Sequence, residues 1–129
     1  MASHETQLAF YNQSAQGVTI TVSQIDSYDW DGQSRPDVNF QNIYLAPGNS
    51  YSQREEVNAY ANSAWVCMSL SLSDGTALSY RFDQYDAYNG ISPTPRVIPV
   101  DGNGGTKHTV VQRVDKSAAT NSFTLYSDL

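Results

Sequence analysis

Apolar and polar residues alternate with a period of two along most of the chain. Leu8 and Phe10 share one side of the first such run, and Val18, Ile20 and Val22 share one side of the next. Successive side chains of a β-strand point to opposite faces, so this alternation is typical of strands that bury one face. The pattern therefore predicts strands over residues 7–12 and 18–25.

The alternation slips by one residue near the end of the second run. A period of two places Gln24 on the same face as Val22, yet the next apolar residue is Ile25. A β-bulge adds one residue to a strand and restores the phase. We therefore predict a bulge near Ser23 and Gln24.

Similar runs continue to the end of the chain, separated by residues that favour turns. Pro47-Gly48 and the Ser-Asp-Gly-Thr stretch at 73–76 predict tight turns. Pro99 places the short run at 96–100 on a sheet edge, because proline has no N–H to donate to a neighbouring strand. The residues expected to face the core in the later runs are Val66, Met68, Leu70, Leu72, Leu78, Tyr80, Phe82, Phe123 and Leu125.

This organisation is typical of an all-β protein. We count about eight or nine short strands, and regular short strands with Gly and Pro turns indicate a single antiparallel β-sandwich. Residues 51–65 are the one helical candidate, with a single turn at most. No linker divides the chain, so residues 1–129 are expected to form one domain.

Composition excludes several partners. Thirteen acidic and seven basic side chains give a net charge of −6, and the basic residues are scattered. Nucleic acid and anionic lipid both require clustered Lys and Arg, so neither is expected as a partner. No apolar stretch is long enough for a transmembrane helix. We see no signal peptide, which favours a cytoplasmic or non-classically secreted protein.

Enzyme chemistry finds little support in the sequence. A Ser-His-Asp triad would have to use His108, and no nucleophile elbow of the G-x-S-x-G type is present. Glu55 and Glu56 are adjacent, so they would face opposite sides of a strand. Asp83 and Asp86 could lie close together, but small sandwiches rarely form the deep cleft that glycosidase carboxylates need. We predict that the protein is not an enzyme and needs no cofactor.

Calcium is the one metal that the sequence leaves open. Asp26, Asp29 and Asp31 alternate with other residues, as the oxygen ligands of calcium loops often do. An EF-hand would also need an acidic residue or Asn where Ser27 stands and a glutamate where Val38 stands. The EF-hand is therefore excluded, and an irregular calcium site remains an alternative. One cysteine and two distant histidines give no zinc spacing.

Two acidic aromatic stretches resemble each other. Residues 24–32 read QIDSYDWDG and residues 81–90 read RFDQYDAYNG. Exposed Tyr and Trp combine flat apolar area with a hydrogen-bonding tip, which suits sugars, lipid head groups or protein hot spots. Adjacent loops would form one composite site, in which rings dock on the ligand and carboxylates accept hydrogen bonds. The candidate ligand-binding residues are Tyr28, Asp29, Trp30, Asp31, Tyr85, Asp86 and Tyr88.

The favoured function is a recognition module that docks these loops onto a membrane lipid or glycolipid. A soluble lectin that uses the same residues on free glycans is the first alternative. A structural or protein-interaction subunit is the second. Each hypothesis requires exposed aromatic side chains, and Trp30 is the residue on which the membrane hypothesis depends most.

The order of several stretches resembles the aegerolysins, a family of small acidic β-sandwich proteins. The matching stretches are FYNQS, VTITV, WDG, IYLAPGNSYS and SLSDGTALSYRFDQYDAYNG, which cover most of the chain. Of the family's Trp-Gly-Lys segment only Trp30 has a counterpart, and its Cys-Gly-Arg and Pro-Trp-Gly segments have no match. The resemblance implies a β-sandwich that binds particular membrane lipids, often in sphingolipid-rich membranes. It also implies a toxin or cytolysin component that forms pores with a larger partner protein.

Overall fold

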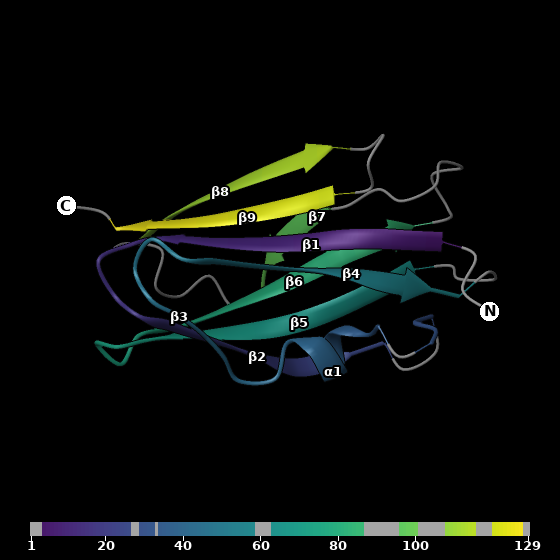
Figure 1. Ribbon diagram of the computed structural model, residues 1–129, viewed down its shortest axis with the longest axis horizontal. Coiled ribbons are helices and arrows are strands. Elements are labelled where there is room, and N and C mark those ends of the chain that lie inside the picture. The colour runs from purple at the N-terminus through teal and green to yellow at the C-terminus, as the bar shows by residue number, and fades with distance from the viewer. Residues whose placement is uncertain are drawn as a thin grey trace.

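A computed structural model describes residues 4–26, 29–32, 34–58, 63–86, 96–100, 108–115 and 120–127 (Figure 1). These ranges hold nine strands and one short helix. The elements are β1 (His4–Gln13), β2 (Val18–Ile25), α1 (Pro36–Asn39), β3 (Ile43–Leu45), β4 (Ser50–Val57), β5 (Ser63–Leu72), β6 (Ala77–Asp86), β7 (Arg96–Pro99), β8 (His108–Asp115) and β9 (Thr120–Ser127).

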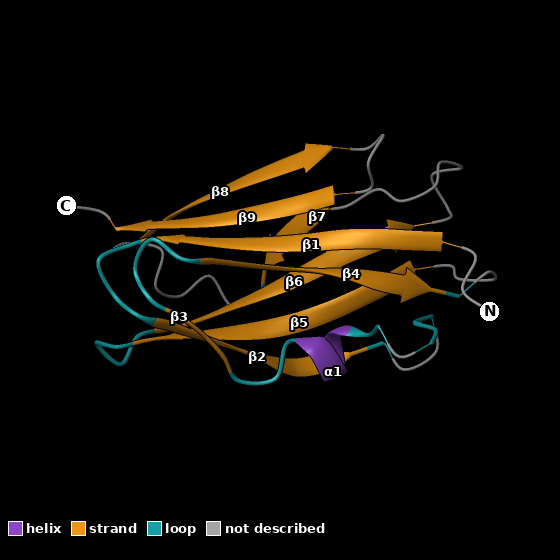
Figure 2. Cartoon of the chain, in the orientation of Figure 1, coloured by secondary structure: helices purple, strands orange, loops and turns teal. Residues whose placement is uncertain are grey.

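The strands form two sheets that pack face to face, as Figures 1 and 2 show. The four-stranded sheet has the order β4-β1-β9-β8, and the five-stranded sheet has the order β3-β2-β5-β6-β7. The predicted all-β fold and sandwich architecture are confirmed. Strand β1 pairs with β9 in parallel, whereas the other paired strands that the structure describes are antiparallel. The antiparallel pairing expected from the sequence holds in the other described ladders, and the β1–β9 ladder is the exception.

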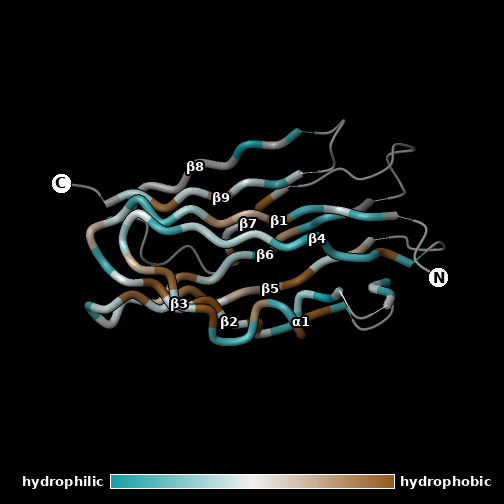
Figure 3. Tube along the Cα trace, viewed as in Figure 1, coloured by the Kyte–Doolittle hydropathy of each residue, from teal (hydrophilic) through white to brown (hydrophobic). Residues whose placement is uncertain are grey.

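The core lies between the sheets and confirms the predicted alternation. Phe10, Phe82 and Phe123 come from three strands, and Phe40 follows α1. The ring of Phe10 lies 5.1–5.5 Å, centroid to centroid, from the other three rings. Tilted and edge-on pairs at these distances contribute beyond their buried area. Figure 3 shows hydrophobic residues along β5 within the sandwich, while most of β4 is hydrophilic. The inward residues predicted in the later runs are buried or pack against the core.

Local predictions about bulges, turns and edges also hold. The β2–β5 register shifts between Val22 and Gln24, where the bulge was predicted. Gly48 and Gly75 have φ angles of 85° and 93°, which residues with a β-carbon rarely adopt. Strand β7 lies at the edge of its sheet, where Pro99 lacks an N–H for a further neighbour.

The helical candidate at residues 51–65 forms strand wherever the structure describes it. Residues 51–57 belong to β4 and residues 63–65 to β5, while 59–62 lie outside the described residues, and the described helix is Pro36–Asn39. The period-two pattern of β4 is hidden because polar Gln53 and Glu55 stand on its inward side. Pro36 begins α1 because its fixed φ suits the first helical position and its missing N–H would be unpaired there anyway.

Candidate functional site

The first acidic aromatic stretch connects the two sheets. From the five-stranded sheet, the Trp65 carbonyl accepts hydrogen bonds from the Asp26 backbone N–H and the Trp30 indole N–H, both at 3.1 Å. On the other side, the Asp31 N–H donates to the Glu56 carbonyl at 3.0 Å, and Trp30 forms a β-bridge with Val57. The segment therefore extends the edge of β4 while remaining bonded to β5.

Trp30 is a core residue, which corrects the prediction that it is exposed. Only 3% of its surface is accessible, and it belongs to the main hydrophobic cluster. Its one polar atom finds a partner in the Trp65 carbonyl, so burial of the indole leaves no unpaired donor. The polar neighbours of Trp30 in the sequence misled the prediction, because they satisfy the backbone of the two sheets instead of surrounding an exposed ring.

The aspartates beside Trp30 also take structural roles. Asp29 is buried, and its Oδ2 accepts a hydrogen bond from the Ser63 backbone N–H at 3.2 Å. Asp31 is partly exposed, and its Oδ1 accepts from the Gly32 N–H at 2.8 Å. Gly32 has a φ of 64°, and a β-carbon there would collide with the Glu56 carboxylate. The conformation of the backbone at this turn thus explains why Asp31 is followed by Gly32.

The second acidic aromatic stretch leaves its sheet at the same end as the first. Strands β2 and β6 both run antiparallel to β5, so they point the same way and end beside the start of β5. Asp86 pairs with Ser63, and Tyr85 pairs with Ala64. Of the predicted site, the structure brings the backbone of Asp86 and the carboxylate of Asp29 to Ser63. The side chains of Tyr85 and Asp86, and all of Tyr28 and Tyr88, lie outside what the structure describes.

The candidate catalytic and metal-binding groups do not assemble in the described part of the chain. His108 begins β8, and its side chain lies outside the description. Asp83 is buried and pairs with Arg81 at 2.7 Å, between carboxylate and guanidinium. No cluster of three or more His, Cys, Asp or Glu side chains is found among the described residues. Calcium binding stays a prediction, since parts of both acidic stretches lie outside the description.

Glu55 is a strongly perturbed acid in the described part of the chain. Its side chain faces inward from β4, fully buried, and both carboxylate oxygens accept hydrogen bonds from the Asn39 amide at 3.1 and 3.2 Å. Burial raises the pKa of Glu55 from 4.5 to about 7, and the negative charges of Asp37 and Glu56 add to the increase. The Asn39 hydrogen bonds act in the opposite direction. This group has no exposed face, so it is unsuited to bind a ligand.

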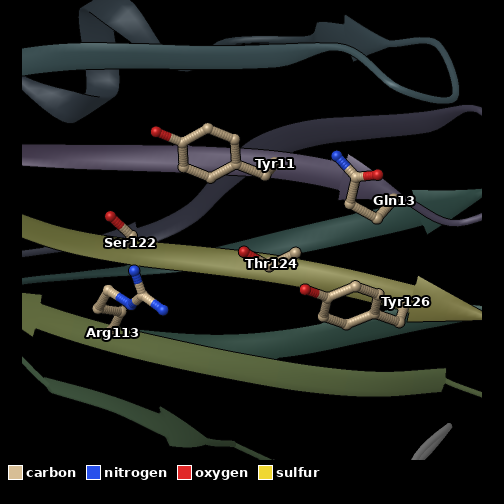
Figure 4. A pocket seen from close by; sticks show the side chains of 6 residues that line it. All are labelled: Tyr11, Gln13, Arg113, Ser122, Thr124 and Tyr126. Carbon is tan, nitrogen blue, oxygen red and sulfur yellow. The ribbon is translucent and has the colours of Figure 1, made fainter.

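A shallow groove crosses the outer face of the four-stranded sheet (Figure 4). Its volume is about 380 Å³, and the flat strand backbones of β1, β9 and β8 form its floor. Tyr11 and Tyr126 each expose 41% of their surface. The side chains that line the groove are Tyr11, Gln13, Arg113, Ser122, Thr124 and Tyr126.

Strand register brings these groove residues together. In the parallel β1–β9 ladder Tyr11 pairs with Thr124, and Gln13 pairs with Tyr126. In the antiparallel β8–β9 ladder Arg113 pairs with Ser122. Figure 4 shows the Arg113 guanidinium on one side, Tyr11 on the other, and the hydroxyl groups of β9 between them. The groove lies over the end of β1, whereas the first acidic stretch joins β4 opposite the start of β1.

The sequence contained part of the information needed to find this groove. Since Phe10, Phe123 and Leu125 face inward, alternation places their neighbours Tyr11 and Thr124 outward. Only the β1–β9 pairing makes the outward residues of the two strands adjacent, and these strands lie at opposite ends of the chain. The prediction looked for aromatic residues in loops and therefore passed over aromatic residues in strands.

Comparisons with known proteins identify the fold. The chain is similar in structure to IP-1A from Alcaligenes faecalis, with a TM-score of 0.63, 10% identity, and coverage of 99% of this chain and 94% of that protein. It is also similar to RahU, solved in complex with a Tris molecule, with a TM-score of 0.61, 9% identity and 96% of each chain covered. No protein-family model and no curated protein sequence matches the chain. Among the described residues, no helix has the length and apolar character to cross a bilayer. At these identities the similarity shows a shared β-sandwich fold.

Proposed function

We propose that this protein is a non-enzymatic recognition module that binds a glycan in the groove on its four-stranded sheet. The observation that carries the proposal is the pair of half-exposed tyrosines, Tyr11 and Tyr126, on a face that also presents hydroxyl and amide groups. The groove holds about 380 Å³, within the roughly 300–1,000 Å³ typical of small-ligand sites.

The chemistry of the groove suits a sugar. A pyranose ring has apolar C–H faces that stack on flat aromatic rings, and tyrosine adds a hydroxyl that donates and accepts. Ser122 and Thr124 contribute further hydroxyls, and the Gln13 amide presents one donor group and one acceptor. Sugar hydroxyls can therefore exchange water for protein partners on several sides of one ring.

Burial of Trp30 reduces the support for membrane insertion. The favoured sequence hypothesis needed this indole to enter a lipid interface, and the indole instead fills the core. The groove lies on a strand face, away from the acidic stretches, and its lining combines two tyrosine rings with the polar groups of Gln13, Arg113, Ser122 and Thr124. Glycan recognition, the first alternative from the sequence, therefore replaces lipid insertion as the leading proposal.

Three sequence predictions stay open beside this proposal. These are aegerolysin membership, binding to a membrane lipid or glycolipid, and joint action with a larger protein partner. A protein-interaction role would use the same exposed tyrosines on a different ligand. The experiment below separates a glycan from a sugar-free lipid surface.

The test is a glycan array followed by calorimetric titration of the tightest-binding glycan. The double variant Tyr11→Thr with Tyr126→Thr should weaken binding about tenfold or more, as loss of central aromatic contacts usually does. Tyr44→Thr is the matched control, because Tyr44 is also exposed, at 64%, but belongs to β3 of the other sheet. It should leave the affinity unchanged.

Two results would reject glycan recognition at this groove. Binding to vesicles of sugar-free phosphatidylcholine and sphingomyelin, with no response on the array, would favour the lipid hypothesis. Glycan binding that Tyr44→Thr weakens as much as the double variant does would place the site elsewhere.

A further inference from the structure

Two arginines on the outer face of the four-stranded sheet differ in their partners. Arg54 on β4 lies 3.4 Å from the Glu5 carboxylate and donates to the Gln7 side-chain oxygen at 3.4 Å. Arg113 on β8 is exposed and lines the groove. Within the described part of the chain, the guanidinium of Arg113 takes part in no ion pair or hydrogen bond. One guanidinium is thus neutralised by the protein, and the other remains available at the candidate site.

The position of Arg113 lets it act together with the sugar-binding groups. It pairs across the ladder with Ser122, and its guanidinium lies beside the hydroxyls of β9 (Figure 4). A guanidinium presents a planar fork of N–H donors that matches the two oxygens of a carboxylate or sulfate. A ring stacked on Tyr11 or Tyr126 could therefore place an acidic substituent on this fork.

We propose that the groove selects glycans that carry an acidic group, a carboxylate or a sulfate, and that Arg113 is the residue that binds it. This inference rests on the proposed glycan function and adds the chemical class of the ligand. Arg113 determines specificity, while the tyrosines supply the affinity that neutral and acidic sugars share.

The charge of the whole protein shapes this selectivity. The net charge is −6, so the long-range field repels an acidic ligand instead of steering it to the groove. Preference for an acid must therefore come from direct contact with Arg113. A lysine at this position keeps the charge but loses the fork of donors, so it should restore only part of the preference.

The experiment compares three soluble probes of matched size: lactose, sialyllactose and sulfated lactose. Calorimetric titration of the full chain should show the two acidic probes binding about tenfold more tightly than lactose, since hydrogen bonds to charged groups are the stronger kind. Arg113→Gln should abolish this difference, weakening the binding of the two acidic probes far more than the binding of lactose. Arg113→Lys should restore part of the difference. Arg54→Gln is the matched control on the same face and should change neither affinity.

Each alternative result overturns the inference in a distinguishable way. Equal affinity of wild-type protein for all three probes would reject acid selection while leaving the glycan function intact. Equal loss of neutral and acidic binding in Arg113→Gln would mean that Arg113 supports the groove in general. No binding of any probe, with a silent glycan array, would reject the proposed function itself. Capture by sugar-free phosphatidylserine vesicles as strong as by ganglioside vesicles would show that anionic lipid suffices.

Discussion

Two regions rich in aromatic and polar residues differ in whether the fold buries or exposes their rings. In the first acidic aromatic stretch, residues 24–32, Trp30 lies among aspartates and is nevertheless buried. On the outer face of the four-stranded sheet, Tyr11 and Tyr126 lie next to core residues in the sequence and are half-exposed. The exposure of a ring depends on which element covers it, and the polarity of its sequence neighbours is a poor guide to that.

The difference has a physical cause in each region. The polar groups around Trp30 are used to join two sheets, since Asp29 binds the Ser63 N–H and Asp31 binds the Glu56 carbonyl. The tyrosines stand on strands whose opposite side forms the core, so alternation directs them outward. The first region therefore stabilises the sandwich, and the second presents a surface for binding. The following predictions test this division, beginning with the largest effect.

Trp30→Ala should lower the free energy of unfolding by about 3–5 kcal/mol, the usual cost of deleting a large buried aromatic side chain. Urea denaturation followed by circular dichroism measures this loss. Trp30→Phe should cost less, because it keeps most of the buried area and loses the hydrogen bond to the Trp65 carbonyl. A Trp30→Ala midpoint equal to that of the wild type would mean that the indole is not part of the core.

Glu55 should make the region around β4 and α1 sensitive to pH. Its pKa is about 7 in the folded protein against 4.5 ordinarily, so the folded state holds a proton that the unfolded state has already released. The associated stability is complete below pH 4.5 and is lost as the pH rises from 4.5 through about 7. The loss should be on the order of 3 kcal/mol at pH 8.

The variant Glu55→Gln is the measurement that isolates this effect. It carries no charge, so it should be more stable than the wild type at pH 8 and similar at pH 4.5, in urea titrations at each pH. If the free energies of unfolding of the two proteins changed in parallel across this pH range, the raised pKa of Glu55 would be contradicted. Binding at the distant groove should follow the fraction folded and show no separate dependence on Glu55.

Tyr11→Thr and Tyr126→Thr should have the smallest effect on stability, within about 1 kcal/mol, because threonine keeps strand propensity and the rings are half-exposed. The urea midpoints of these variants test this expectation beside that of Trp30→Ala. A loss as large as that of Trp30→Ala would show that the tyrosines support the fold, and the contrast between the two regions would disappear.

The sequence by itself determined the local structure of most strands. Alternation identified Leu8, Phe10 and the inward side of β5, and the slip at Gln24 located the bulge. It failed where inward positions are polar, as at Glu55 in β4, because the apolar pattern is then interrupted. The successes and the failures share a cause. The period of a strand can be read only from consecutive residues, so it is visible where the inward residues are apolar and hidden where they are polar.

Tertiary structure alone decided which surfaces are covered. Trp30 became a core residue because Trp65 and Val57, far along the chain, supply its partners. The groove exists because β1 and β9, from opposite ends of the chain, pair in parallel and align Tyr11 with Thr124. Pairing between distant strands is set by the packing of the whole sandwich, so the pattern within any single strand could indicate the outward face but not its neighbours.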